Sequence, residues 1–197
     1  MTFLFFATLI GLIAYSAQLG ILVYLHFISS YDPVSQAISD YGVGPTKKIF
    51  SLYLWLNNIG TIGLGVGLAT LSYIPVWIVI CFGIVLISRT GIIYFPTDLE
   101  GARRTSTGKL HYMFALILFV LSAVVICKIT ALVQSRIEWN SIDTTLIVLA
   151  FFSIVSLLAT VVTSTVYKKV FGLVERIFIV AISVWFIVLN AFVLFIL

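Results

Sequence analysis

Many of the ionisable side chains that could do chemistry in this 197-residue chain fall between positions 89 and 111. This stretch contains Arg89, a pair of adjacent arginines, the carboxylate of Asp98 and the imidazole of His111. A histidine beside a carboxylate is a typical acid/base pair, and arginine side chains are suited to binding phosphate or carboxylate groups. The same pairs also occur as ordinary structural hydrogen bonds and ion pairs, so the residue types alone leave both interpretations open.

Two further segments contain the remaining candidates. Asp40 lies in the run Ile-Ser-Asp-Tyr-Gly, and two adjacent charged residues lie near the start of the last apolar run. The candidate catalytic residues are His111, Asp98 and Asp40. The candidate ligand-binding residues, chosen for charge or for hydrogen-bonding side chains, are Arg89, Arg103, Arg104, Ser39, Asn58, Glu175 and Arg176.

The sequence excludes several familiar kinds of site. His26 and His111 are the only 2 histidines, so a three-histidine zinc site is impossible, and neither a GxSxG nor an HExxH motif occurs. Cys81 and Cys127 fall in apolar runs without a CxxC spacing, which is typical of buried apolar thiols. A site made of both histidines and aspartates would require two helix ends to adjoin. We therefore predict no metal site and no cofactor.

Composition identifies the elements that must position these residues. Hydrophobic residues make up 62% of the chain and charged residues 9%, and the mean hydropathy is +1.23, whereas soluble domains carry about 25% charged residues. Apolar runs of about 20 residues can cross a bilayer as helices. We therefore expect an all-α polytopic transmembrane bundle, forming a single integral membrane domain over residues 1–197. Its six predicted spans cover about residues 3–28, 48–71, 75–95, 109–133, 144–167 and 174–197.

Residues 32–42 predict a short amphipathic helix that lies at the membrane interface after the first span. Asp32 and Pro33 are typical of a helix start, and Gly42 of a helix end. The apolar residues at helical spacing between them are Val34, Ala37, Ile38 and Tyr41. Asp40 would lie in the last turn, where the helix dipole disfavours an anion by about 0.3–1 kcal/mol. Either a cation or a hydrogen-bond donor pairs with it, or it is a solvated carboxylate near the lysines that follow.

Several polar and small residues lie inside the predicted spans. Arg89 lies well inside the end of the third span, where a cation costs a few kcal/mol unless it reaches the interface or finds a partner. Asn57 and Asn58 either line a polar pocket or bridge two helices. Gly63 and Gly67 form a small-xxx-small spacing, which we expect to bring two helices of the same chain together rather than two copies of the chain.

The distribution of positive charge predicts an orientation. With six spans, the loops after the first, third and fifth spans share one face. They contain most of the 11 Lys and Arg residues, namely Lys47, Lys48, Arg103, Arg104, Lys109, Lys168, Lys169 and Arg176. The positive-inside rule predicts that these loops face the cytoplasm of a cell membrane and that both termini lie outside. This signal and contact with anionic headgroups explain the net charge of +4, so no nucleic-acid partner is expected.

Three runs of residues carry a resemblance to a known family. They are Tyr31 to Pro45, Phe95-Pro96-Thr97-Asp98 with Gly108 and His111, and Gly172-Leu173-Val174-Glu175-Arg176. Over essentially its whole length the chain resembles the domain-of-unknown-function 998 family of bacterial and archaeal membrane proteins. The Ile-Ser-Asp-Tyr-Gly piece is the most specific, and it is more distantly similar to the Ile-Ser-Asp segment of the damage-regulated autophagy modulator family. The resemblance implies a membrane domain of six or seven helices, and it implies no particular reaction.

Three functions fit these residues. We favour a non-catalytic bundle that binds membrane lipids, a second copy of the chain or another membrane protein, with its charges forming an interhelical network. An enzyme acting on a lipid headgroup would use His111 as the acid/base, with Asp40 or Asp98 orienting it and arginines holding a phosphate. A small transporter would use the polar residues inside the spans, although no internal repeat is evident. A substrate-sized pocket would favour the enzyme and a closed ion-pair cluster the non-catalytic bundle; the deciding residues are Asp40, Arg89, Asp98 and His111.

Overall fold

The computed structural model describes residues 2–69, 74–99, 101–136 and 141–196, and in these ranges it contains six α-helices and no strand. The helices are α1 (Thr2–Ile28), α2 (Lys47–Ala69), α3 (Val76–Tyr94), α4 (Ser106–Arg136), α5 (Ser141–Thr165) and α6 (Phe171–Ile196). All six have a stretch long and apolar enough to cross a membrane. The predicted all-α bundle with six spans is therefore confirmed. The predicted span ends at 71 and 197 lie outside the described residues.

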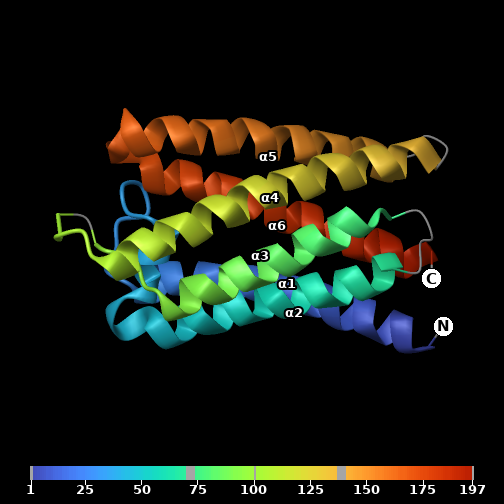
Figure 1. The fold of residues 1–197 in the computed structure, drawn as a ribbon, viewed down its shortest axis with the longest axis horizontal. Helices are drawn as coiled ribbons and strands as arrows, with labels where there is room; N and C mark the ends of the chain where they lie inside the picture. Colours follow the sequence, from blue (N-terminus) through green and yellow to red (C-terminus); the bar gives the residue numbers. More distant parts are fainter. Residues whose placement is uncertain (1, 70–73, 100, 137–140, 197) are drawn as a thin grey trace.

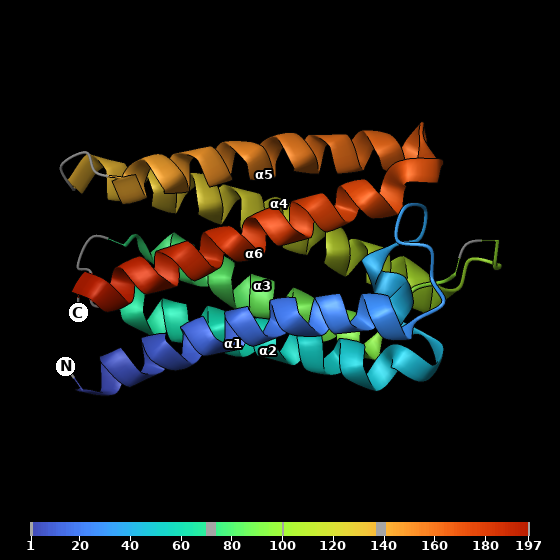
Figure 2. The ribbon, with the colours of Figure 1, turned by 180° about the vertical axis from the view of Figure 1, so that it is seen from behind.

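The helices lie side by side along the long axis of the molecule (Figure 1). Both ends of the chain lie at one end of the bundle, and the connections after α1, α3 and α5 lie at the other, which we call the loop end. Figure 2 shows α6 crossing the middle of the bundle. There α6 contacts α1, α2, α4 and α5, so residues of α6 can reach both halves of the fold.

Helices α1 and α2 pack closely because glycines face one another. A Cβ atom at Gly63 would lie 2.8 Å from the backbone nitrogen of Gly11, so any larger residue would push the two helices apart. Gly67 similarly lies against Thr8 of α1 and Val193 of α6. The small-xxx-small spacing is therefore used within the chain, as predicted.

Two apolar clusters fill the bundle, one centred on Trp185 and the other on Phe178 at the loop end. Both side chains are fully buried, and the indole nitrogen of Trp185 donates a hydrogen bond to Thr130 Oγ1 at 3.1 Å. Outward-facing positions are also mostly apolar, which suits helices that contact lipid on one side and one another on the other.

A short helix follows α1, as predicted, but it is the 3-10 helix η1 (Ile38–Gly42). It is preceded by a turn over residues 33–36. The carboxylate of Asp32 caps this turn by accepting hydrogen bonds from the backbone of residues 34 and 35. The backbone of Ala37 is extended, which separates the turn from η1. Ile38 and Tyr41 are 2% and 0% exposed, so this part of the apolar face packs into the bundle rather than against the membrane interface, whereas Val34 in the preceding turn is 40% exposed.

Candidate functional site

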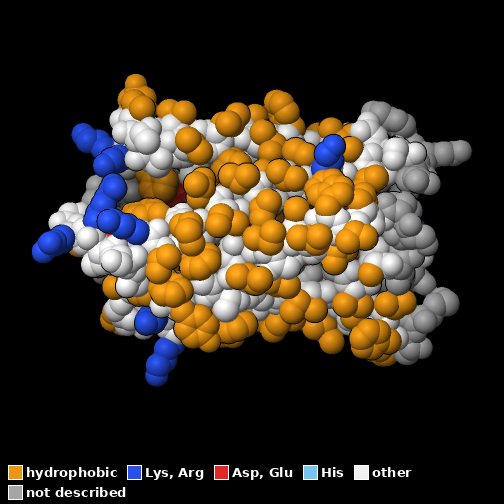
Figure 3. All heavy atoms as spheres, in the orientation of Figure 1, with side chains coloured by type: hydrophobic (Ala, Val, Ile, Leu, Met, Phe, Trp, Pro, Cys, Tyr) orange, Lys and Arg blue, Asp and Glu red, His pale blue; other side chains and the backbone are white. Residues whose placement is uncertain are grey.

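A cavity of about 610 Å³ extends from the loop end into the bundle. Its wall is formed by helices α2 to α6 and by residues 35–40, 97–99, 101, 102, 104 and 168. The charged side chains of the wall are Asp40, Arg89, Asp98, Arg104, Lys168 and Glu175, with His111 among them. Figure 3 shows a hollow near the end where Lys and Arg side chains gather, with an acidic side chain visible inside it. The volume lies within the range of about 300–1,000 Å³ that is typical of small-molecule sites.

Arg89 of α3 lies in the interior and does not extend to the interface. Its side chain is 4% exposed, and its Nη1 donates hydrogen bonds to Asn58 Oδ1 at 3.0 Å and Thr61 Oγ1 at 3.1 Å. Both acceptors are neutral side chains of α2. Among the described residues, no acidic side chain forms an ion pair with Arg89. Of the two alternatives for Arg89, the structure therefore shows a side chain with partners inside the bundle, Asn58 among them, rather than one that reaches the interface.

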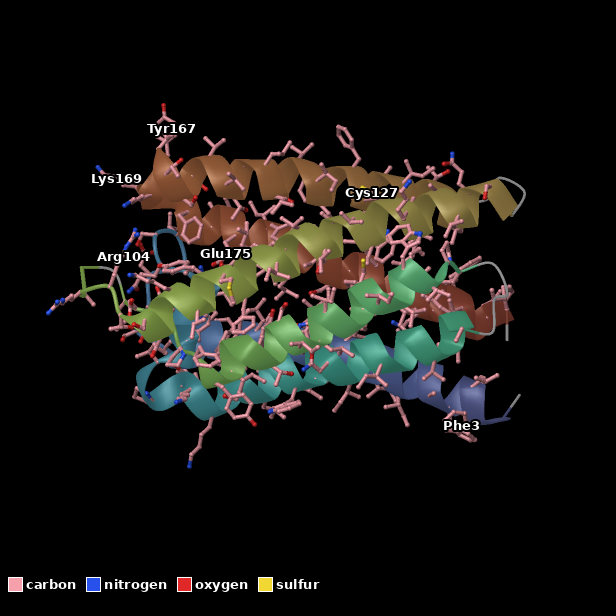
Figure 4. The ribbon with its side chains drawn as sticks, viewed as in Figure 1. Phe3, Arg104, Cys127, Tyr167, Lys169 and Glu175 are labelled. Carbon is pink, nitrogen blue, oxygen red and sulfur yellow. The ribbon has the colours of Figure 1, made fainter. Side chains whose placement is uncertain are left out.

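Glu175 of α6 holds η1 in the cavity wall. Its Oε2 accepts a hydrogen bond at 2.7 Å from the backbone nitrogen of Ile38, and the side chain is 6% exposed. Asp40 is also 6% exposed, and its Oδ2 accepts a hydrogen bond at 3.0 Å from the backbone nitrogen of Ala37. Asp40 is therefore a buried, hydrogen-bonded carboxylate rather than a solvated one. In Figure 4, Glu175 and Arg104 lie toward the loop end, opposite Phe3.

Arg176, the next residue of α6, binds the backbone of the preceding turn. Its Nη1 donates hydrogen bonds to the carbonyl oxygens of Pro33 at 2.9 Å and Gln36 at 2.7 Å. Its Nη2 donates to the hydroxyl of Tyr41 at 3.0 Å. Arg176 is not among the residues of the cavity wall, so its contacts position the segment 33–41 rather than a ligand.

His111 of α4 is 3% exposed and lies in the cavity wall. Its Nδ1 lies 2.8 Å from the carbonyl oxygen of Phe95. Because a carbonyl oxygen can only accept, Nδ1 carries the proton, and Nε2 is then the ring nitrogen with a lone pair in the neutral form. The imidazole is thus oriented by the backbone carbonyl of Phe95. The sequence had suggested Asp40 or Asp98 for this role.

Asp98 is bonded to the start of α4 instead. Its carboxylate accepts hydrogen bonds from the backbone nitrogen of Thr105 at 2.8 Å and from the Thr105 hydroxyl at 2.7 Å. These bonds, the backbone one first, hold the pKa of Asp98 below its ordinary value. Thr105 in turn caps α4 by accepting a hydrogen bond from the backbone nitrogen of Gly108. A side chain at position 108 would collide with the Asp98 carboxylate, so Gly108 permits this close approach.

Two exposed cations, Arg104 and Lys168, lie where the cavity meets the loop end. A shallower cleft of about 250 Å³ shares Arg104, Asp98 and Tyr112 with the cavity. Arg103 is exposed and lies outside both walls. Of the adjacent pair of arginines, only the second therefore faces the candidate site.

Sequence reasoning missed the contribution of α5 to the cavity. Thr160 and Ser164 lie in its wall, and the hydroxyl of Thr160 also donates to the backbone oxygen of Ser156 at 2.8 Å. The available signal was the spacing of Ser153, Ser156 and Thr160, which places these hydroxyls along one side of an otherwise apolar helix. Within the described residues, no group of three or more His, Cys, Asp or Glu is arranged to hold a metal ion.

A comparison with family models places residues 5–191 within a family described as "Protein of unknown function (DUF998)". No curated protein and no solved structure gives a significant match to the chain. The match covers nearly the whole chain, including the segment 33–42, the loop after α3 and the start of α6.

Proposed function

The chain belongs to the family described as protein of unknown function (DUF998), and we propose that it binds a membrane amphiphile in the cavity at the loop end. The headgroup would lie among the buried polar residues, and the apolar chain would pass between α4 and α5. The observation that carries this proposal is a cavity of about 610 Å³ whose wall includes both charged side chains and lipid-facing apolar ones.

The path of the two helices supports access from the bilayer. Helices α4 and α5 lie close at the end near the chain termini and diverge toward the loop end (Figures 1 and 2). Leu116 of α4 is 63% exposed and Val161 of α5 is 54% exposed, yet both also line the cavity. Because the same side chains meet the outer surface and the cavity, a lipid chain could occupy the space between them.

The binding proposal can be tested by filling the cavity from one small residue. Ala115 of α4 lies in the wall, whereas Ala131 of the same helix is exposed and outside it. Native mass spectrometry in mild detergent should detect a specific lipid on the wild type and on Ala131→Trp. We expect at least a tenfold loss of that lipid on Ala115→Trp. Equal retention by both variants, or no lipid on the wild type, would rule out the cavity as a lipid site.

His111 favours a second candidate function, that of an enzyme acting on the bound headgroup. The hydrogen bond to Phe95 leaves Nε2 of His111 as a possible general base beside the cavity. A suitable variant is His111→Asn, because its amide can still donate to the Phe95 carbonyl but offers no basic nitrogen. If the protein is an enzyme, the wild type should convert its bound lipid, and His111→Asn should bind the lipid without converting it. If the wild type leaves the lipid unchanged, the non-catalytic function holds.

We also propose that the loop end faces the cytoplasm of a cell membrane. Exposed Lys47, Lys48, Arg103, Arg104, Lys109, Lys168 and Lys169 at this end support that orientation. A cysteine at position 48 in a Cys81→Ser, Cys127→Ser background should react with a membrane-impermeant maleimide only after the cells are opened. Labelling in intact cells would instead show that the loop end faces the outside of the cell.

A further inference from the structure

We propose that Arg89 binds the anionic group of the amphiphile, so that the cavity selects a lipid bearing a singly charged oxyanion, either a phosphodiester or a carboxylate. This inference rests on the proposed function of the cavity. It concerns the chemistry of the ligand, which the cavity volume alone does not determine.

The hydrogen bonds of Arg89 leave part of its guanidinium available. Nη1 makes both described bonds, to Asn58 Oδ1 and Thr61 Oγ1. Among the described residues, neither Nε nor Nη2 of Arg89 has a hydrogen-bond acceptor. Both atoms keep some exposed surface, since neither is among the fully enclosed polar atoms without a partner. The side chain is 4% exposed and lies in the cavity wall, so these donors are accessible from the cavity. A guanidinium in this state is suited to a planar or tetrahedral oxyanion.

A cation in the interior of a membrane bundle needs an anionic or strongly polar partner. The two acceptors of Nη1 are neutral oxygens, which solvate the charge only in part. A protein that used Arg89 only to join α2 and α3 could do so with a neutral donor at lower cost. The positive charge of the Arg89 guanidinium therefore points to a negatively charged partner, which the cavity is large enough to admit.

The surrounding network fixes the orientation of Arg89. The hydroxyl of Thr61 donates to the backbone oxygen of Asn57 at 2.9 Å, so Tyr15, whose hydroxyl lies 2.8 Å away, must donate to Thr61. The amide of Asn58 donates to Thr90 Oγ1 at 3.1 Å, which directs Asn58 Oδ1 toward Arg89. The guanidinium is therefore held in place before a ligand arrives.

The carboxylates of the wall limit the charge of the ligand. Asp40, Asp98 and Glu175 offset the three cations of the same wall, so the cavity has no excess of positive charge that would hold a free, multiply charged phosphate. A phosphodiester or a fatty-acid carboxylate has a single negative charge, and its apolar chain can occupy the space between α4 and α5. A lipid thus fits the cavity better than an inorganic ion does.

The test compares four ligands with the same purified protein in detergent. They are a phosphatidylglycerol, oleate, a neutral diacylglycerol of matched chain length, and inorganic phosphate. We expect the wild type to bind the phosphatidylglycerol or oleate at least tenfold more tightly than the diacylglycerol. Inorganic phosphate should not compete at millimolar concentration; if it displaces the lipid completely, the ligand is a free anion and the proposal fails.

Two variants separate binding from folding. Arg89→Gln should abolish the preference for the anionic lipid while the diacylglycerol still binds. Asn58→Asp places a carboxylate at the acceptor of Nη1, so Arg89 gains a charged partner within the fold and its attraction for the anionic ligand is reduced. Lys128→Gln, at an exposed cation of α4 outside the wall, should leave the preference unchanged. If Arg89→Gln and Asn58→Asp both keep the wild-type preference, Arg89 is not the anion site. If the wild type binds neither lipid, the function proposed for the cavity fails as well.

Discussion

Replacing Arg176 should release the segment 33–41 from α6. The change Arg176→Met keeps most of the side-chain volume and removes every donor. It abolishes three hydrogen bonds to this segment, to the Pro33 carbonyl, the Gln36 carbonyl and the Tyr41 hydroxyl, whose lengths are 2.9, 2.7 and 3.0 Å. It also removes the bond of Nη1 to the Gly172 carbonyl within α6, at 2.9 Å. The two carbonyl oxygens would then lack their charged partner at the loop end of the bundle.

The expected cost follows from these bonds. A hydrogen bond to a charged group contributes about 1.5–3 kcal/mol, so three would total at least about 4 kcal/mol if no other partner replaced them. Arg176 is only partly buried, so water can replace part of what is lost. We therefore expect a loss of about 3 kcal/mol, which corresponds to a melting temperature lower by about 6–12 °C in a protein of this size.

Thermal unfolding in detergent and hydrogen exchange of residues 33–42 measure this effect. The matched control is Arg103→Met, because Arg103 is exposed and lies at the same end of the bundle. Arg176→Met should unfold at a lower temperature than the control and exchange faster in residues 33–42. If the two variants melt within about 2 °C of each other and residues 33–42 exchange equally, these hydrogen bonds do not hold the segment in place.

Three further predictions concern the scaffold. Gly63→Val should separate α1 from α2, because a Cβ at Gly63 already lies 2.8 Å from the Gly11 nitrogen, and should lower expression and melting temperature more than Gly65→Val, where the added Cβ meets open space. Thr105→Ala should destabilise α4 by about 1 kcal/mol through loss of its cap, measured by thermal unfolding. The pKa of Asp98 is lowered in the folded protein. Its hydrogen bonds therefore stabilise the loop fully at pH values above the ordinary pKa of about 3.9, and this stabilisation is lost as the pH falls through the lower pKa of the folded protein. Measured relative to the intrinsic exchange rate at each pH, the protection of residues 96–99 and 101–105 should therefore fall below about pH 4 in the wild type but not in Asp98→Asn; equal pH dependence in both would contradict this.

The sequence predicted those features that depend on local pattern. Runs of apolar residues identified the six helices, and the apolar stripe identified Ile38 and Tyr41 as one face of a short helix. That face was predicted to lie against the membrane interface, whereas both side chains pack into the bundle. The stripe did not reveal the type of helix, because it does not show that the backbone of Ala37 is extended or that Glu175 of α6 binds the backbone nitrogen of Ile38.

The partners within the candidate site could not be predicted in this way. The histidine side chain of position 111 is oriented by the Phe95 carbonyl, and a backbone oxygen leaves no signature in residue types. Arg176 donates to the backbone oxygens of Pro33 and Gln36, which lie far from it in the sequence. Backbone oxygens are present at every residue, so the sequence gives no sign that these are the partners of Arg176. Sequence spacing also does not show where α4 and α5 diverge, although this divergence decides which side chains can line a cavity.

Arg176 and Arg89 are at least partly buried, but they differ in their hydrogen-bond partners. Arg176 donates to backbone carbonyls and a hydroxyl of one segment, so its removal should affect the stability of that segment first. Arg89 uses one nitrogen for neutral side chains and has further donors accessible from the cavity. Its removal should therefore change ligand selection more than local exchange. If Arg89→Gln instead matched Arg176→Met, with lower stability and no change in lipid preference, both arginines would be parts of the scaffold and the cavity would lack a charge-specific site.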